Sequence, residues 1–335
     1  MVQLTVSAAS KPVSLARGLP LTIEVTPETT VADVKRAIAE KYPRFKPSRQ
    51  RITLKGERKP LETETKLSDV LDAGAKTWEL DVKDLGAQIS WRTVFIVEYL
   101  GPLLIHPVFY HFPKIFYGVD VQHSALQKWV LLFSFLQASG WFAEYRQGDR
   151  RRDTWMSAYV YAFTMLHFLK RELETLYVHR FSHDTMPWVN IFRNSGVLFA
   201  ADIYRPAFSA TSPAIVNSIR SNEHFLWACT GLWAFAEISN LHTHLTVRSL
   251  RPPGTRRRAI PYGYGFNLVS FPNYFFEIVG WVVISVMTRS IGVSIFTAVA
   301  TCTMGLWAAK KHRNYKKEFG KEYPRNRKAM IPFIF

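Results

Sequence analysis

The stretch TVFIVEYLGPLLIHPVFYHF, residues Thr93–Phe112, decides the fold of this chain. It runs for 20 residues with Glu98 as its one acidic side chain and with no Lys or Arg. A bilayer core about 30 Å thick is crossed by about 20 residues of helix, so the stretch is predicted to span a membrane. An ionised carboxylate at that depth costs roughly 2.5 to 3.5 kcal/mol unless it is paired or lines a cavity. Glu98 is therefore a candidate functional residue.

Further runs of apolar or aromatic residues follow along the chain. They are Leu126–Phe142, Trp155–Leu169, Trp188–Ala207, Phe225–Leu241, Tyr274–Met287 and Ile291–Ala309. Several are shorter than a full span or contain ionisable groups, so the sequence predicts an all-α, multi-pass transmembrane bundle of six or seven spans. The basic loop around Arg256 and the tail Lys310–Lys328 are expected on the cytosolic side. An even number of spans agrees best with a cytosolic tail and a cytosolic N-terminal module.

The first 85 residues have the pattern of a small α+β module. Strands are predicted at Val2–Val6, Leu21–Val25, Arg51–Leu54 and Trp78–Val82. A helix capped by Thr30 and ending before Pro43 follows the second strand, and a short helix at Leu67–Leu71 follows the third. The predicted order is therefore strand, strand, helix, strand, short helix, strand. This is the order of a β-grasp fold, and the segment resembles ubiquitin-like domains. It is either a docking module or a scaffold for packing and insertion, and conjugation is not implied because no Gly-Gly precedes Gln88. We therefore expect a ubiquitin-like domain at 1–85 and a membrane domain at 86–335.

Charge and cysteine content narrow the class of function. The chain carries 43 Lys and Arg residues and 26 Asp and Glu residues. Residues 1–86 hold 15 of the basic and 12 of the acidic ones. The aromatic-rich remainder therefore has 28 basic and 14 acidic residues. Long uncharged runs in that remainder favour a membrane surface over nucleic acid. Cys229 and Cys302 lie in apolar runs, which predicts buried packing residues. No secretory signal peptide is recognised at the start, so internal segments are expected to direct insertion.

Lys170 and Arg171 follow directly on an apolar run and are candidate site residues. Glu174 lies four residues after Lys170, so these two can meet on one helix face, while Arg171 is expected to project about 100° away. The alternative is a helix end with snorkelling cations that nearby glutamates neutralise.

The histidines do not predict a metal centre. His179 and His183 form an H-x-x-x-H, and His242 and His244 an H-x-H, but the H-x-x-H-H runs of membrane di-iron enzymes do not occur in the sequence. These residues are interpreted as polar groups at a membrane–water boundary.

A cationic and amide-bearing stripe precedes the Pro-Gly turn at 252–254. Helical spacing brings Asn240, His244, Arg248 and Arg251 near one face. Arginine makes bidentate contacts with phosphate oxygens, so the stripe suits a phosphorylated ligand, with an anionic lipid contact as the alternative. Neither a G-x-G-x-x-G after a strand nor a Walker A sequence occurs, so a nucleotide would bind without a Rossmann domain.

Polar residues also open the next helix. Pro272 suits its first turn, and Asn273, Tyr274 and Glu277 occupy adjacent positions around its N-terminal end. A buried phenol at this place can donate a proton, which makes Tyr274 a candidate general acid.

These motifs together resemble a known family. The motifs Leu250-Arg251-Pro252-x-Gly254, Pro272-Asn273-Tyr274-x-x-Glu277, Lys311-His312-Arg313-x-Tyr315 and Ile331–Phe335 are similar to those of the steroid 5-alpha-reductase family. Within that family, Ile89–Phe95, Glu98-Tyr99-x-Gly101-Pro102, Lys170–His183 and Thr185–Pro187 resemble the very-long-chain trans-2-enoyl-CoA reductases. The similarity runs along nearly the whole chain, and the ubiquitin-like start fits this branch.

The resemblance implies an NADPH-dependent oxidoreductase that reduces a trans-2-enoyl-CoA in the last step of fatty-acid elongation. Hydride is delivered to C3, and Tyr274 is implied as the donor of a proton to C2. Glu98, Lys170 and Arg171 match active-site polar positions, and either cation could stabilise the enolate or orient the tyrosine. Positions around NADPH are matched by Asn240, Arg248, Arg251, Asn273, Glu277, His312 and Tyr315. His244 departs from the pattern, because the steroid branch carries an acid there.

The resemblance also implies a cellular setting. This is a multi-pass protein of the endoplasmic reticulum membrane, in very-long-chain fatty-acid and sphingolipid metabolism, with its active site open to the cytosol. The implied partners are an acyl-CoA substrate, the lipid bilayer and the condensing enzyme, ketoreductase and dehydratase of elongation, and no nucleic acid. The stretch between Val121 and Trp155 departs from the pattern and is expected to add a span or a hairpin. A steroid-type reductase and a non-enzymatic ubiquitin-like membrane adaptor remain as alternatives.

Overall fold

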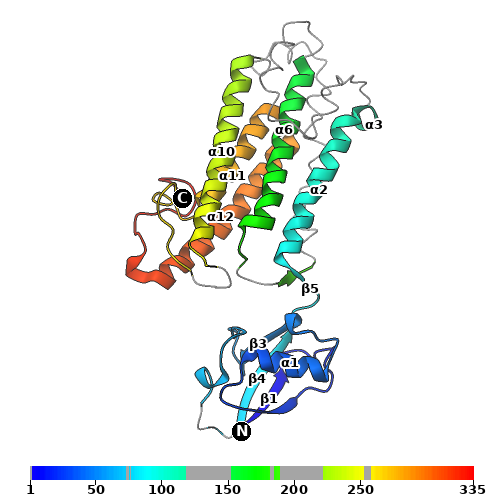
Figure 1. Ribbon diagram of the computed structural model, residues 1–335, viewed down its shortest axis with the longest axis vertical. Coiled ribbons are helices and arrows are strands. Elements are labelled where there is room, and N and C mark those ends of the chain that lie inside the picture. Colours follow the sequence, from blue (N-terminus) through cyan, green and yellow to red (C-terminus); the bar gives the residue numbers. More distant parts are fainter. Residues whose placement is uncertain are drawn as a thin grey trace. The chain divides into compact units, whose positions relative to one another are not determined.

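The computed structural model describes residues 2–72, 75, 77–117, 152–181, 185–188, 222–252 and 258–335. Two compact units are present, which are described in turn (Figure 1). The first comprises residues up to Val94 together with the short strand near residue 186, and the second comprises the helices that follow. The predicted spans Leu126–Phe142 and Trp188–Ala207, and the unmatched stretch after Val121, lie outside the described residues except for their ends.

The first unit is built on a four-stranded sheet with one helix. The strands β1 (Val2–Ala8), β2 (Leu21–Val25), β3 (Gln50–Leu54) and β4 (Thr77–Asp84) lie in the order β2-β1-β4-β3. The central pair, β1 and β4, is parallel, and the two outer pairs are antiparallel. Alternation sends Leu4 and Val6 of β1 into the core, where both are fully buried.

Helix α1 (Val31–Lys41) packs its apolar face into the same core. Val31, Val34 and Ile38 are buried, and Thr30 and Asp33 form a reciprocal capping box at its start. Single turns of 3₁₀-helix, η1 (Pro47–Arg49) and η2 (Leu67–Asp69), complete the element order. The predicted ubiquitin-like β-grasp order is therefore confirmed. A further small ladder pairs β5 (Gln88–Ser90) with β6 (Thr185–Pro187).

The second unit is a set of long helices. They are α2 (Trp91–His111), α3 (Pro113–Tyr117), α6 (Arg152–Leu173), the π-helical turn η4 (Glu174–Val178), α10 (Glu223–Ser249), α11 (Pro272–Thr288) and α12 (Ile291–Phe319), which is followed by the turn η7 (Gly320–Glu322). Helix α11 lies beside α10 and also contacts α6 and α12 (Figure 1). Pro272 occupies the first turn of α11, as predicted. The packing of α6, α10 and α11 positions the polar residues described below.

Aromatic stacking forms the core between these helices. The ring of Phe163 on α6 stacks on Trp233 of α10 at 4.4 Å, and Tyr161 stacks on Tyr110 of α2 at 4.2 Å. Cys229 is buried in this cluster, as predicted. The same prediction is wrong for Cys302, which is exposed because it lies on the outer side of α12.

Two stretches of the described chain are long and apolar enough to cross a membrane, α2 and Ile291–Glu322. Only 28% and 22% of their apolar windows are buried inside the protein, whereas a core helix of a soluble domain would be mostly buried. Their exposed residues include Leu104 and Leu306. Helix α11 is apolar but shorter. The helical architecture agrees with the sequence analysis, and the number of six or seven spans stays a prediction.

Candidate active site

Asn240 of α10 links polar groups from three helices. Its amide nitrogen donates to the backbone oxygen of Asn273 at 2.8 Å and to Oε2 of Glu277 at 3.1 Å, both on α11. Its amide oxygen accepts from Nζ of Lys170 on α6 at 2.7 Å. Asn240 is 1% exposed, and the side chains of Lys170 and Glu277 are 16% and 17% exposed, so the group is largely held away from bulk solvent. Four of the residues singled out by the sequence thus meet at one place.

Two residues that the sequence analysis missed complete this cluster. Glu237 of α10 places Oε2 at 2.6 Å from Nζ of Lys170 and Oε1 at 2.8 Å from Nδ1 of His167. The other ring nitrogen of His167 lies 3.3 Å from Oε1 of Glu277. A signal was available, because Glu237 is an acid inside a predicted span, like Glu98, and precedes Asn240 by one helical turn.

The close approach of α10 and α11 leaves room for the Glu237 carboxylate. Gly280 of α11 faces it, and a Cβ at this glycine would lie 3.3 Å from Oε1 of Glu237. A larger side chain at this position would press on the carboxylate. The cluster therefore depends on a small residue in the facing helix.

Arg171 does not project away from Glu174 as predicted. Its Nη1 lies 2.6 Å from Oε2 of Glu174, whereas Nζ of Lys170 lies 3.9 Å from Oε1. The reason is that Arg171 and Glu174 are three residues apart, a spacing that brings two side chains together on a helix as the spacing of four does for Lys170. Nη2 of Arg171 donates to the hydroxyl of Tyr99 on α2 at 2.8 Å. Glu98, the residue before Tyr99, is buried on the same helix.

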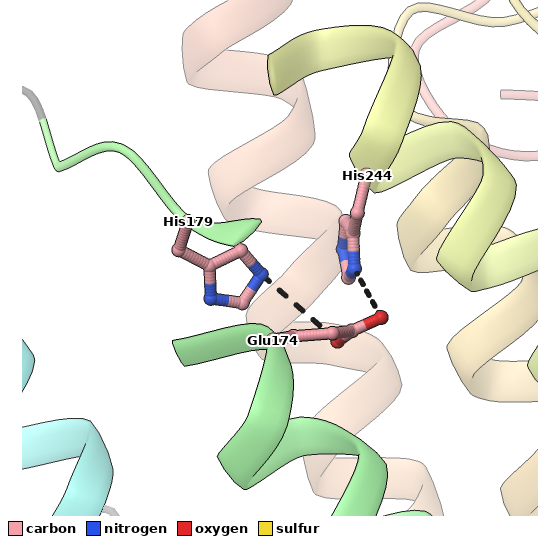
Figure 2. A group of neighbouring side chains, drawn as sticks. All are labelled: Glu174, His179 and His244. Atoms are coloured by element: carbon pink, nitrogen blue, oxygen red, sulfur yellow. Dashed lines mark ion pairs between the residues drawn. The ribbon is translucent and has the colours of Figure 1, made fainter. Parts of the chain in front are cut away.

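Glu174 also meets two histidines (Figure 2). Oε1 lies 3.1 Å from Nδ1 of His244, and Oε2 lies 4.0 Å from Nε2 of His179. Burial alone would raise the pKa of Glu174, but the hydrogen bond from His244 and the charge of Arg171 lower it to about 2. Burial, with Arg171 nearby, lowers the pKa of His179 to about 3. At neutral pH the carboxylate is ionised and His179 is uncharged.

The ligand atoms of Glu174, His179 and His244 lie within 4.8 Å of one another, a spacing that can hold a metal ion. The guanidinium of Arg171 already pairs with Oε2 of the Glu174 carboxylate. A divalent cation there would be repelled by the guanidinium, so we interpret the group as part of the charged cluster. His183, the partner of His179 in the sequence motif, lies outside the described residues.

The predicted phosphate-binding arginines lie at the C-terminal end of α10. Nη1 of Arg251 donates to the backbone oxygen of Arg180 at 2.8 Å, and Nη1 of Arg180 donates to the backbone oxygen of Arg248 at 3.2 Å. Arg248 is exposed. These contacts link Arg180 and Arg251 to each other and to the backbone of Arg248, about two helical turns beyond Asn240 on α10.

Tyr274, His312 and Tyr315 lie in a second group, on the α12 side of α11. The hydroxyl of Tyr274 accepts from Nζ of Lys311 at 2.8 Å. His312 is buried, with Nδ1 at 2.5 Å from Oγ of Ser270, and Tyr315 stacks on Phe271. Residues 273 and 277 share a helix face that turns toward α10, whereas residue 274 is about 100° away. Asn240 and Tyr274 thus belong to separate groups of the predicted site residues, and Arg171 with Glu174 and the arginines at the end of α10 lie in others.

Comparisons with known proteins agree with this architecture. The pattern of 3-oxo-5-alpha-steroid 4-dehydrogenases matches residues 184–335, and that of the TECR ubiquitin-like domain matches residues 20–80. A putative enoyl reductase of Schizosaccharomyces pombe is 43% identical over 78% of this chain and 77% of its own length. A very-long-chain enoyl-CoA reductase of Dictyostelium discoideum is 36% identical over 91% and 92%, and a probable one of Caenorhabditis elegans is 34% identical over 95% of both chains.

A ubiquitin-like domain joined to a helical unit that gathers buried charges, together with these matches, defines an oxidoreductase of the steroid-reductase type. More narrowly, the chain belongs to the very-long-chain enoyl-CoA reductase family.

Proposed function

We propose that this protein reduces the 2,3 double bond of a trans-2-enoyl-CoA to the saturated acyl-CoA, using NADPH, as the last step of very-long-chain fatty-acid elongation. The names of its relatives support the reaction class. The observation that carries the proposal is the buried meeting of Lys170, Asn240 and Glu277 from three helices. Buried charges of this kind are retained where a reaction or a ligand needs them.

The residues present fit a nicotinamide dinucleotide. Arg248 and Arg251 offer guanidinium donors suited to phosphate oxygens, and Arg248 is exposed to a ligand. The carboxylate of Glu277, whose side chain is 17% exposed, can accept from the N–H₂ of a carboxamide, and the amide of Asn240 orients that carboxylate. When bound, NADPH supplies the hydride that adds to C3 of the substrate.

Side chains of the protein then stabilise the negative charge of the enolate and supply the proton that is added at C2. Hydride addition leaves an enolate on the thioester oxygen, which a fixed cation stabilises better than water does. Nε of Arg171 is buried without a hydrogen-bond partner among the described residues, so this guanidinium has a donor to offer. The ammonium of Lys170 lies near Glu174, the carboxylate with which Arg171 is paired. Tyr274 donates its hydroxyl proton to C2, and Glu98 contributes charge near Tyr99 and Arg171.

We also propose where in the cell the protein lies and how it is placed in the membrane. The reductase unit, 86–335, is a multi-pass protein of the endoplasmic reticulum membrane with six or seven spans and a site open to the cytosol. The outward apolar faces of α2 and α12 and the basic tail support this. The ubiquitin-like unit, 1–85, then lies on the cytosolic side. The trans-2-enoyl-CoA substrate is supplied by the condensing enzyme, ketoreductase and dehydratase of the same cycle.

The test is consumption of NADPH by the purified full-length protein in liposomes, with trans-2-enoyl-CoA of graded chain length. We expect saturated acyl-CoA in equal amount to the NADPH consumed, and NADH to be a poorer donor. Tyr274→Phe should lower kcat by at least about a hundredfold, as expected for loss of a general acid. No turnover of any enoyl-CoA by the wild type would sink the proposal, and full activity of the variant would remove Tyr274 as the donor.

A steroid-type reductase is the second candidate, because the pattern matching residues 184–335 is named for steroid substrates. It uses the same cofactor residues with a sterol enone in place of the thioester. Assays with both substrates in competition separate the two. Preference for the sterol by kcat/KM would replace the enoyl-CoA assignment.

A further inference from the structure

The hydroxyl of Tyr274 faces a lysine ammonium that the proposed mechanism has not used. Nζ of Lys311 lies 2.8 Å from this hydroxyl and 5.3 Å from the ring centre. Those two distances place the ammonium beyond the hydroxyl, on its side away from the ring, and not over the face of the ring. Lys311 therefore acts on the phenol oxygen as a hydrogen-bond donor.

Aromatic stacking fixes the ring in this position. The rings of Tyr274 and Phe271 stack at 5.7 Å, and Phe271 stacks on Tyr315 of α12 at 5.8 Å with an interplanar angle of 5°. Lys311 lies one helical turn before Tyr315, so the same face of α12 presents both the stacking ring and the ammonium. The tyrosine has little freedom to turn its hydroxyl away from Lys311.

A buried hydrogen bond sets the register between the two helices. Oγ of Ser270 lies 2.5 Å from Nδ1 of His312, and these residues are direct neighbours of Phe271 and Lys311 in the sequence. The backbone N–H of Phe271 donates to the oxygen of Ala329 at 3.1 Å. The contacts of His312 with Ser270 and of Tyr315 with Phe271 thus hold the segments that carry Lys311 and Tyr274 in place.

We propose that Lys311 is the positioning residue of Tyr274, which orients its hydroxyl and returns its proton after each turnover. The proposal rests on the proposed function and on Tyr274 as the proton donor. Tyr274 gives its O–H proton to C2, a C–H bond forms, and the phenol becomes a phenolate. Lys311 transfers an N–H proton to that oxygen and becomes a neutral amine, which takes a proton from water.

The position of Lys311 suits this relay. Its side chain is exposed, so the amine can be reprotonated from solvent, while Tyr274 is half-buried. The ammonium also opposes the negative charge that forms on the phenol oxygen during transfer. One solvent proton is consumed in each cycle, which balances the hydride delivered by the cofactor.

The test compares Lys311→Met, Lys311→Arg and Lys311→Ala with the matched control Lys310→Met in the full-length protein. Lys310 is the exposed neighbour, with no partner in the part of the chain that the structure describes. For Lys311→Met we expect kcat to fall by about ten- to a hundredfold while KM for enoyl-CoA and Kd for NADPH stay within about twofold, the split expected for loss of a proton-transfer contribution. Lys311→Arg keeps the charge and the hydrogen bond but cannot release a proton, so its kcat should also fall, whereas methylamine should restore activity to Lys311→Ala.

Three results would overturn the proposal. These are unchanged kcat in Lys311→Met, loss of NADPH binding together with activity, or a lack of rescue of Lys311→Ala by methylamine. The failure of the proposed function looks different, because then the wild type does not reduce enoyl-CoA or Tyr274→Phe remains active. An active wild type, an inactive Tyr274→Phe and a fully active Lys311→Met would sink the Lys311 inference alone.

Discussion

At the scale of single residues, the charges that matter most are those paired inside the helices. Glu237 holds both His167 and Lys170, and each of these also meets a group of the Asn240 cluster. A cation left without its carboxylate in a buried site is strongly unfavourable. Glu237 is therefore expected to maintain the position of Lys170 without itself touching substrate.

Glu237→Gln should lower the stability of the helical unit by up to about 3 kcal/mol, because two buried cationic partners lose their counter-charge. Activity should fall with it. The measurement is thermal unfolding in detergent together with kcat. Glu318→Gln is the control, since Glu318 makes an exposed pair with Arg258, and such pairs contribute about 0–1 kcal/mol. Equal effects of both substitutions would contradict the importance of the Glu237 pairs.

The Glu174 group predicts how stability depends on pH. The pKa of His179 is lowered from 6.5 to about 3. Below pH 6.5 the unfolded chain therefore binds a proton at this residue that the folded protein does not bind, which lowers the stability of the folded protein. The pKa of Glu174 is lowered from 4.5 to about 2, which has the same sign over a more acidic range. Both contributions are complete at neutral pH and are lost on acidification, His179 between pH 6.5 and 3 and Glu174 between 4.5 and 2.

His179→Gln should therefore flatten the decline of the melting temperature between pH 6.5 and 4.5 and leave the steeper decline below pH 4.5. Melting curves of both proteins at half-unit intervals measure this. Parallel curves across the whole range would show that His179 is not held neutral in the folded protein.

The predictability of these residues from sequence was uneven for a physical reason. Asn240, Lys170 and Glu277 stand out because polar groups in apolar runs need partners. Glu237 and His167 carry the same signal, but their role appears only when α6 and α10 are packed together. The pairing of Arg171 with Glu174 was predictable as well, because their spacing of three residues brings two side chains together on a helix.

At the scale of elements, the contact of α10 with α11 determines the site. The predicted runs Phe225–Leu241 and Tyr274–Met287 correspond to α10 and α11, and the cap at Thr30 and the proline at 272 were predictable from local chemistry. Helix α10 continues to Ser249, eight residues beyond the predicted run, because His244 and Arg248 extend it as a polar continuation. Hydropathy measures apolar length, not helix length.

Gly280 tests this contact. Gly280→Leu should reduce activity strongly, because its Cβ alone would lie 3.3 Å from the Glu237 carboxylate and the rest of the side chain would separate α11 from α10. Gly231→Leu on α10 is the matched control, since nothing in the described chain lies within 4 Å of a Cβ there. The comparison is made by kcat and by melting temperature. Equal tolerance of both leucines would contradict the close approach.

At the scale of the whole molecule, the candidate site lies within one of the two units. All the predicted site residues lie in the helical unit. In the ubiquitin-like unit, Leu85 is the one exposed large apolar side chain among the described residues up to 85. The fold of this unit was predictable from strand alternation, whereas the number of spans was not, because short runs with charges fit buried helices and membrane helices alike.

The most direct test of the account follows the two added hydrogens. The purified protein is given trans-2-enoyl-CoA and NADPH carrying deuterium at the transferable position, and separately unlabelled NADPH in deuterated water. We predict deuterium at C3 of the saturated acyl-CoA in the first case and at C2 in the second, with neither product formed by Tyr274→Phe. Saturated product lacking the cofactor's deuterium, or no product from the wild type, would contradict the account.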